Sequence, residues 1–160
     1  ATSIIPPSNL GEMARYSDAV VIAKMVKKST TQIENRSFSE FEFETVEIIH
    51  QANYQIPQRF SLRSMSFSNN QISSKIDGDI HFEEHQQYLL MLDYESGRFR
   101  PMLLSYGIFQ LVNQANQNYM VPVPESFEFI IEDDDNYEKL KVYQSEKLIQ
   151  QLKEYSNKHH

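Results

Sequence analysis

The stretch that decides the fold is Gly78-Asp-Ile-His-Phe-Glu-Glu-His-Gln-Gln-Tyr-Leu-Leu-Met-Leu92. It ends in a continuous apolar run, Tyr88 to Leu92, which polar residues bound on both sides. A run of this length is too short for a buried helix and is typical of a strand whose two faces are both covered. We therefore expect a central strand at residues 88–94, with turns at Asp77-Gly78 before it and Ser96-Gly97 after it.

Further strand patterns lie on both sides of this run. Residues rich in β-branched and aromatic side chains predict strands at 19–26, 38–49, 60–67 and 106–112. Residues 119–123 are predicted to pair back as a short edge strand, since Pro122 and Pro124 are tolerated only there. Polar loops are expected at 27–36, 68–75 and 113–118. The apolar positions change parity within 38–49 and again after Leu62, which predicts β-bulges or sharp bends.

Helical patterns are confined to the two ends. Asn9-Leu-Gly-Glu12 has the form of a capping box and predicts a short helix that ends near Ser17-Asp18. Leu148, Ile149, Leu152 and Tyr155 predict an amphipathic helix from about Ser145, whereas residues 137–144 fit helix or strand. The fold class is therefore mainly β, a small barrel of five to six strands with a short N-terminal helix and a C-terminal amphipathic helix.

The 160 residues fit one domain. We expect an extended lead-in at 1–8, the barrel with its N-terminal helix at 9–131, and an acidic turn with a helical appendage at 132–157. Fifteen basic against 22 acidic residues give a formal charge of -7, which argues against nucleic acid or an anionic membrane as partner. No apolar run approaches the length of about 20 residues that spans a bilayer.

The absence of cysteine excludes disulfides, thiolate catalysis and Cys-based zinc sites. No cofactor is expected, and the oligomeric state is predicted to be a monomer or a weak homodimer. The first residue is Ala1 rather than Met, which fits signal-peptide cleavage or a trimmed tag, and His159-His160 fit a tag remnant. We expect a secreted or periplasmic protein.

Four pieces of the chain carry a resemblance to a known family. They are residues 10–24, Phe41-Glu-Phe-Glu-Thr-Val-Glu-Ile-Ile49, Gly78 with Phe82 and Tyr88-Leu-Leu-Met-Leu92, and Tyr106-Gly-Ile-Phe109. Together they span about residues 9–112 and resemble secreted bacterial domains with an OB-like barrel, similar in fold to the tissue inhibitors of metalloproteases. The resemblance implies a non-catalytic module of the kind sometimes found with extracellular proteases. Two positions depart from the family: His85-Gln-Gln replaces the usual Gly, and Ala1 cannot chelate zinc as the inhibitors' N-terminal Cys does.

His81-Phe-Glu-Glu-His85 fits the H-x-x-E-H pattern of inverted zinc peptidases, in which two histidines bind zinc and a Glu, here Glu84, activates a water. That chemistry needs both imidazoles on one helical face. The adjoining strand removes most of the helical context, and an extended segment would separate residues 81 and 85 by about 13 Å, at about 3.3 Å per residue. Structural or solvent-facing histidines are the favoured interpretation, ahead of an adventitious or regulatory metal site and of catalysis.

Two weaker patterns have equally plain alternatives. Glu132-Asp-Asp-Asp135 offers carboxylates to Ca²⁺ but lacks the spacing of a calcium loop, so a solvated acidic turn is favoured. Phe60 and Phe67 with Arg59 and Arg63 could form the stacking and cationic face by which OB barrels bind single strands. Core positions for the two Phe residues are favoured.

Three functions stay open. The favoured one is a non-enzymatic secreted or periplasmic binding module that presents loops to a protein partner. Its predicted contact residues are Asn69, Asn70, Gln71, Asn113, Gln114 and Asn116. The alternatives are a zinc-dependent hydrolase that uses His81, Glu84 and His85, and an OB-type nucleic-acid-binding domain.

Overall fold

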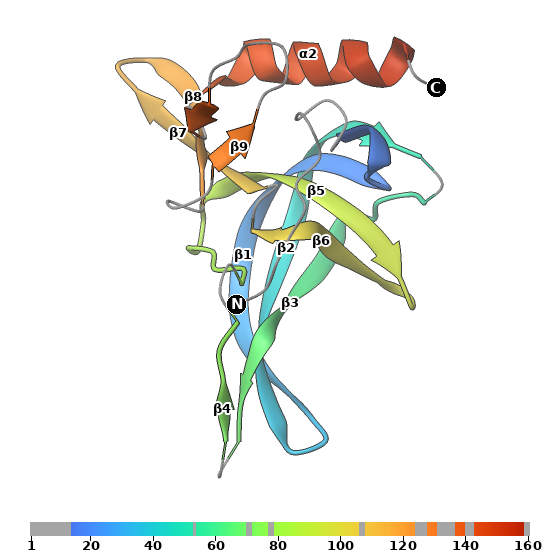
Figure 1. Cartoon of the computed structure of the whole chain (residues 1–160), viewed down its shortest axis with the longest axis vertical. Helices are drawn as coiled ribbons and strands as arrows, with labels where there is room; N and C mark the ends of the chain where they lie inside the picture. The colour runs from blue at the N-terminus through green and yellow to red at the C-terminus, as the bar shows by residue number, and fades with distance from the viewer. Residues whose placement is uncertain are drawn as a thin grey trace.

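The computed structural model describes residues 14–52, 54–69, 72–76, 79–105, 108–123, 128–130, 137–139 and 143–158. The strands are β1 (Ala19–Ile33), β2 (Arg36–Gln51), β3 (Arg59–Ser68), β4 (Ser73–Ser74), β5 (Gln87–Glu95), β6 (Arg98–Ser105), β7 (Ile108–Gln114), β8 (Gln117–Pro122), β9 (Glu128–Ile130), β10 (Tyr137–Lys139) and β11 (Tyr143–Gln144). A short helical segment at 14–16 precedes β1, and α2 (Ser145–Lys158) follows β11. The fold is mainly β, as the sequence predicts (Figure 1).

Among these described residues, nine strands form one antiparallel sheet in the order β11-β8-β7-β5-β1-β2-β3-β4, with β6 paired to β5 outside this path. One edge of β5 pairs with β1, from Gln87 to Leu92. Its other edge is shared, because β7 pairs with its first half and β6 with its second half. β5 is therefore central to the sheet.

Both faces of β5 are covered, as predicted from its continuous apolar run. Tyr88, Leu90 and Leu92 enter one apolar cluster, while Leu89 and Met91 enter another on the opposite face. All five side chains are buried. A strand with this environment needs no alternation of polar and apolar residues, which explains the run.

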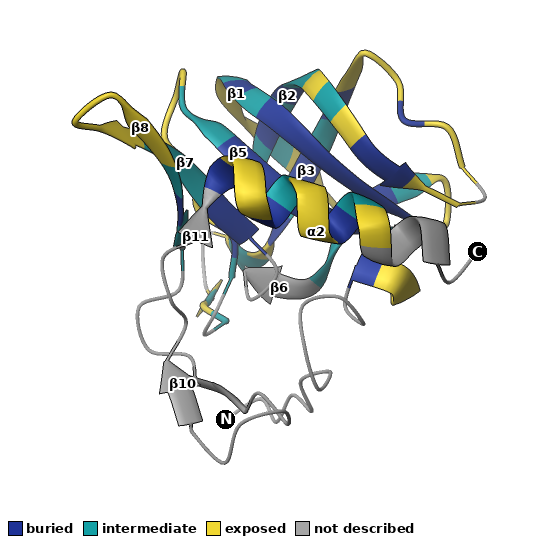
Figure 2. Cartoon of the chain, turned by 90° about the horizontal axis from the view of Figure 1, so that it is seen from above, coloured by how far each residue is buried: buried dark blue, intermediate teal, exposed yellow. Residues whose placement is uncertain are grey.

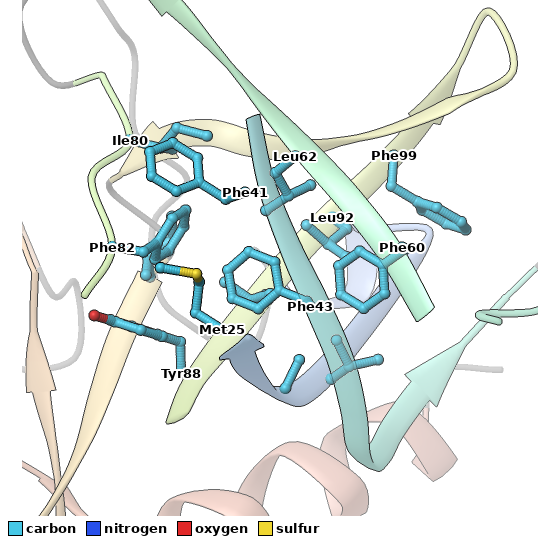
Figure 3. Packing of buried hydrophobic residues seen from close by; sticks show 14 of the residues in the cluster. Met25, Phe41, Phe43, Phe60, Leu62, Ile80, Phe82, Tyr88, Leu92 and Phe99 are labelled. Atoms are coloured by element: carbon cyan, nitrogen blue, oxygen red, sulfur yellow. The ribbon is translucent and has the colours of Figure 1, made fainter. Parts of the chain in front are cut away.

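The first cluster is rich in aromatic rings from β2, β3, β5, β6 and the segment before β5 (Figure 3). Phe43 lies among Phe60, Phe82 and Tyr88, with ring centroids 5.5, 4.8 and 6.4 Å away. Offset and edge-on contacts at these distances are the favoured geometries of aromatic pairs.

The second cluster lies under α2, which crosses the sheet with its buried side turned toward the strands and its exposed side toward solvent (Figure 2). Leu148 and Leu152 are buried against β1, β5 and β8 residues such as Val20, Leu89 and Met120. The predicted amphipathic helix is confirmed. The helical segment at 14–16 ends before Ser17, as predicted, and Ala14 joins the same cluster.

The predicted bulges are confirmed. Ile22 pairs with Glu47 and Ala23 with Thr45, so Val46 is an extra residue on β2 and lies exposed. A second irregularity follows Leu62, where the β2–β3 register shifts opposite Ser39. There the N–H of Ser39 donates to Oγ of Ser64 at 3.0 Å, so a side chain replaces a missing backbone partner.

Several predicted loops are wrong. Residues 27–36 continue β1 and β2 except for a two-residue turn at Glu34-Asn35, whose φ values of 51° and 66° fit a tight hairpin. Similarly, β7 and β8 extend into 113–118 and leave only Ala115-Asn116 as the turn. The predicted 68–75 loop contains β4, which pairs with Phe67 and Ser68 of β3. Twisted two-stranded ribbons tolerate these polar residues because neither face there is buried.

Other differences concern strand content. β6 was not predicted, and β8 is not an edge strand, because it lies between β7 and β11. Residues 137–139 and 143–144 are strands, within the segment where helix and strand both fitted. The turn at Ser96-Gly97 is confirmed, with φ of 54° and 81°. Asp77-Gly78, the 9–12 capping box and the 132–135 acidic turn lie outside the described residues.

Candidate functional site

The predicted contact residues occupy two hairpin ends. Asn113, Gln114 and Asn116 are exposed at the β7–β8 turn, where Nδ2 of Asn113 donates to Oδ1 of Asn118 at 2.9 Å. Asn69 is exposed at the end of β3, and Asn70 and Gln71 lie outside the described residues. The β3–β4 end and the β7–β8 end lie at opposite extremes of the long axis (Figure 1). The two regions therefore do not combine into one surface.

The H-x-x-E-H residues lie in a non-helical segment. Residues 81–83 have no regular structure, and Glu84-His85 form a turn in which His85 has φ of 68°. The N–H of His85 donates to the carbonyl of Met25 at 2.7 Å, so backbone bonds attach this segment to β1. His81, Glu84 and His85 are exposed. Within the described part of the chain, no group of three His, Cys, Asp or Glu is placed to hold a metal ion.

Phe60 and the arginines of β3 lie on opposite faces of the strand. Phe60 is buried and stacks on Phe43, whereas Arg59 bonds to Glu42 and Glu44 on the outer face at 3.4 and 3.1 Å. Phe67, near the end of β3, contacts Phe38 and lies under the guanidinium of Arg36. The predicted stacking and cationic face is therefore divided between two sides of the sheet.

A concave site not predicted from the sequence lies where β6 approaches β3. We call this junction the β3–β6 seam. An ion-paired bridge crosses it, in which Nε of Arg63 donates to Oε2 of Glu40 at 3.1 Å and Nη2 of Arg98 donates to Oε1 at 3.1 Å. The rings of Phe60 and Phe99 meet beneath it at 6.2 Å. Side chains of β2, β3 and β6 thus converge at the seam.

Next to the bridge lies a hollow of about 310 Å³, which we call the seam hollow. Phe38, Ile80, Phe99 and Pro101 supply apolar wall, and Arg63, Arg98 and Arg100 supply positive charge. Asp79 also lines it. Its carboxylate accepts backbone N–H bonds from Met65, Ser66 and Ile80 at 2.8–2.9 Å, and these bonds stabilise its negative charge.

On the other side of Arg98 a more open hollow of about 570 Å³ is lined by Gln55, Tyr94 and Gly97. The bridge therefore separates two depressions along one seam. Arg98 and Phe99 contribute to both.

Arg98 lies between like and opposite charges at the seam. Burial is the largest cause that lowers the pKa of Arg98, followed by the positive charge of Arg63, while Glu40 acts in the opposite direction. The side chains of Arg63 and Arg98 each keep 28% of their surface exposed, and that of Glu40 keeps 17%. The guanidinium groups are thus partly desolvated yet still reachable from solvent.

The charged site residues that sequence reasoning missed are Glu40, Asp79, Arg98 and Arg100. One signal was present, because Arg98-Phe-Arg100 directly after the Ser96-Gly97 turn alternates cationic and aromatic residues with the period of a strand. Pro101 interrupts that pattern at a strand that pairs only with β5 among the described residues. Nothing local in the sequence relates Glu40 or Asp79 to it.

No helix in the described ranges has the length and apolar character to cross a membrane. No protein-family model matches the chain, and neither does any curated protein.

Proposed function

We propose that this chain is a non-enzymatic binding module, secreted or periplasmic, that recognises a protein partner through the β3–β6 seam of an OB-like barrel. The observation that carries the proposal is the seam hollow. Binding sites are typically concave, mostly apolar and equipped with a few convergent polar groups, and the hollow combines these three features. Arg and aromatic residues are also the side chains most enriched in protein interfaces.

Barrel closure is part of the proposal. Starting from β3, the hydrogen-bonded neighbours are β2, β1, β5 and β6. The Phe60–Phe99 contact and the Arg98–Glu40 bond return β6 to the vicinity of β3. Five strands in such a circuit, with one joint made by side chains, agree with the partly open five-stranded OB barrel. Nuclear Overhauser effects between the rings of Phe60 and Phe99 are expected, and their absence would contradict closure.

The seam is favoured over an oligonucleotide-binding face for a specific reason. OB domains that bind oligonucleotides use the face of their second and third strands. Here the outer face of β2 carries Glu40, Glu42 and Glu44 at successive outward positions, next to Arg59 and Arg63 of β3. The arginines are already ion-paired with these carboxylates, which repel phosphates. This row therefore supports a partner other than nucleic acid.

The proposal can be tested by affinity capture with matched baits. Wild-type chain, Arg98→Gln and Arg15→Gln would each be immobilised and exposed to an extracellular or periplasmic fraction, and retained proteins quantified by mass spectrometry. Arg15 is exposed and lines neither depression of the seam. A partner bound through the seam should be retained by wild type and Arg15→Gln and lost with Arg98→Gln, and the purified partner should repeat this order in calorimetry. Equal retention by all three baits, or none above a blank resin, would contradict the proposal.

A further inference from the structure

We infer that the seam hollow binds a carboxylate carried on an apolar or aromatic group, anchored by Arg63 and Arg98, with Glu40 as an internal competitor for both guanidinium groups. The inference rests on the proposed function, because it names the chemistry by which that same site recognises its ligand.

The first support is the charge of the bridge. Two guanidinium groups share one carboxylate, which leaves the Arg63–Glu40–Arg98 bridge with a net charge of +1 (two minus one) on a chain whose formal charge is -7. Arg100 adds a third cation to the wall, and its partner Glu95 is 3.4 Å away, with both side chains largely exposed. The lining of the hollow therefore holds three cations and one anion, Asp79, whereas the partner carboxylates Glu40 and Glu95 are not part of the lining.

The second support is the geometry of the donors. A guanidinium group has five N–H donors in a planar fork, and the bonds to Glu40 use one from Arg63 and one from Arg98. A carboxylate matches that fork and is bound more strongly where water is partly excluded. The two guanidinium groups already bind the carboxylate of Glu40, so a carboxylate from outside meets donors of the appropriate kind.

The third support is the shape and chemistry of the walls. Phe38, Ile80, Phe99 and Pro101 surround a space of about 310 Å³, which is near the lower limit of small-ligand pockets. A phenyl ring or a branched aliphatic group next to the carboxylate would bury apolar surface there at roughly 25 cal/mol per Å². A free phosphate would gain nothing from these walls, so we assign the site to a carboxylate on an apolar body.

The test uses the full chain labelled with ¹⁵N, and monitors the Nε–Hε signals of Arg63 and Arg98 by nuclear magnetic resonance. The probes are benzoate with its neutral analogue benzamide, N-acetylphenylalanine with N-acetylphenylalaninamide, and inorganic phosphate. Benzoate and N-acetylphenylalanine should shift both signals in a saturable manner, and the two amides should not. Tighter binding of N-acetylphenylalanine indicates the carboxyl end of a peptide as the natural source, and tighter binding of benzoate indicates a free acid.

Three variants separate binding from mere stability of the seam. Glu40→Gln releases both guanidinium groups and should tighten benzoate binding about tenfold, since one nearby negative charge is removed. Arg98→Gln should weaken it at least about tenfold, the loss expected for one charge-assisted contact. Arg15→Gln makes the same charge change at an exposed position outside the seam and should leave benzoate affinity unchanged. Amide spectra establish that each variant is folded.

The inference is overturned if benzoate and benzamide act alike, if phosphate binds more tightly than benzoate, or if folded Arg98→Gln binds benzoate as wild type does. It is also overturned if folded Glu40→Gln binds no more tightly. Should either variant fail to fold, the comparison of acids with amides on the wild-type chain still decides. If a protein partner is lost with Arg98→Gln but benzoate has no effect, the proposed binding module stands and only the carboxylate assignment fails. If benzoate binds but no protein partner is retained, the carboxylate assignment stands and the proposed protein-binding function fails.

Discussion

The carboxylate of Asp79 accepts a hydrogen bond from the backbone N–H of Ser66 at 2.8 Å, and this contact joins the segment before β5 to β3 where its pairing with β2 is irregular. The other carboxylate oxygen accepts from Met65 and from Ile80, both at 2.9 Å. Met65 and Ser66 are not in register with β2, so the carboxylate supplies the acceptors for their N–H groups.

Asp79→Ala should lower the free energy of unfolding by about 2–3 kcal/mol, because hydrogen bonds to a charged acceptor are worth about 1.5–3 kcal/mol each and part of the loss is restored by water. Urea unfolding followed by circular dichroism would measure this as a lower midpoint at an unchanged slope. Glu84→Ala, at an exposed turn position, serves as control and should stay within about 0.5 kcal/mol of wild type. A similar small effect for Asp79→Ala would show that the carboxylate does not hold the segment.

Phe43 should be the most costly ring to remove from the aromatic cluster. Its ring contacts those of Phe60, Phe82 and Tyr88, and none of its surface is exposed (Figure 3). Phe43→Ala should cost about 3–5 kcal/mol, and Phe43→Leu clearly less because it leaves a smaller cavity. Val46→Ala, at the bulge on the same strand, should cost less than about 0.5 kcal/mol, since Val46 is exposed. Chemical denaturation of the three variants measures the order, and equal losses for Phe43→Ala and Val46→Ala would contradict it.

The elements that could be predicted are those whose signal is local. The apolar run Tyr88 to Leu92 predicts a strand with both faces buried, whatever strands lie beside it. The change of parity before Ile48 predicts a bulge, because side chains alternate strictly between the two faces of a regular strand. The spacing of Leu148 and Leu152 specifies one buried helix face in the same way.

The seam could not be predicted because its residues meet only through pairing over long distances in sequence. Glu40 and Arg98 are 58 positions apart, and Arg63 lies between them. Taken singly, each is a charged residue at a solvent-facing position of a strand, which does not indicate a site. Likewise, the polar residues 27–36 read as a loop because polarity cannot distinguish a loop from a ribbon exposed on both faces.

Substitution of His85 distinguishes a turn residue with a strained backbone from a zinc ligand. Its φ of 68° is unfavourable for a side-chain-bearing residue by about 1–2 kcal/mol, whereas Gly accepts it freely but adds entropy to the unfolded chain. His85→Gly should therefore raise the free energy of unfolding by about 0.5 kcal/mol. Glu83→Gly is the matched control in the same segment, with no positive φ, and should lower it by about 0.5–1 kcal/mol.

Thermal melts with and without one equivalent of zinc complete that experiment. A hydrolase that uses His81, Glu84 and His85 would bind zinc stoichiometrically, and His85→Gly would abolish any stabilisation by the metal. If His85 serves no metal, the melts with and without zinc should coincide for wild type, and likewise for His85→Gly. A Tm that zinc raises for wild type but not for His85→Gly would support the hydrolase alternative.

Asp93 should make the protein less stable at neutral pH than in mild acid. Burial, followed by the negative charge of Asp18, raises the pKa of Asp93 above its ordinary value of 3.8. The folded chain therefore holds this proton at pH values where the unfolded chain has released it, so stability falls as pH rises from about 3.8 through the folded pKa and is constant above it.

Asp93→Asn removes this loss and can still accept a hydrogen bond. Because Asp93 is half-buried and screened by solvent, the expected rise in Tm at pH 7 is roughly 1–2 °C, shrinking to nothing near pH 3. Glu84→Gln, the same change of charge at an exposed turn, should leave Tm unchanged at both pH values. Equal Tm values for Asp93→Asn and wild type at pH 7 would contradict the raised pKa, and a larger gain in acid than at pH 7 would indicate a lowered pKa instead.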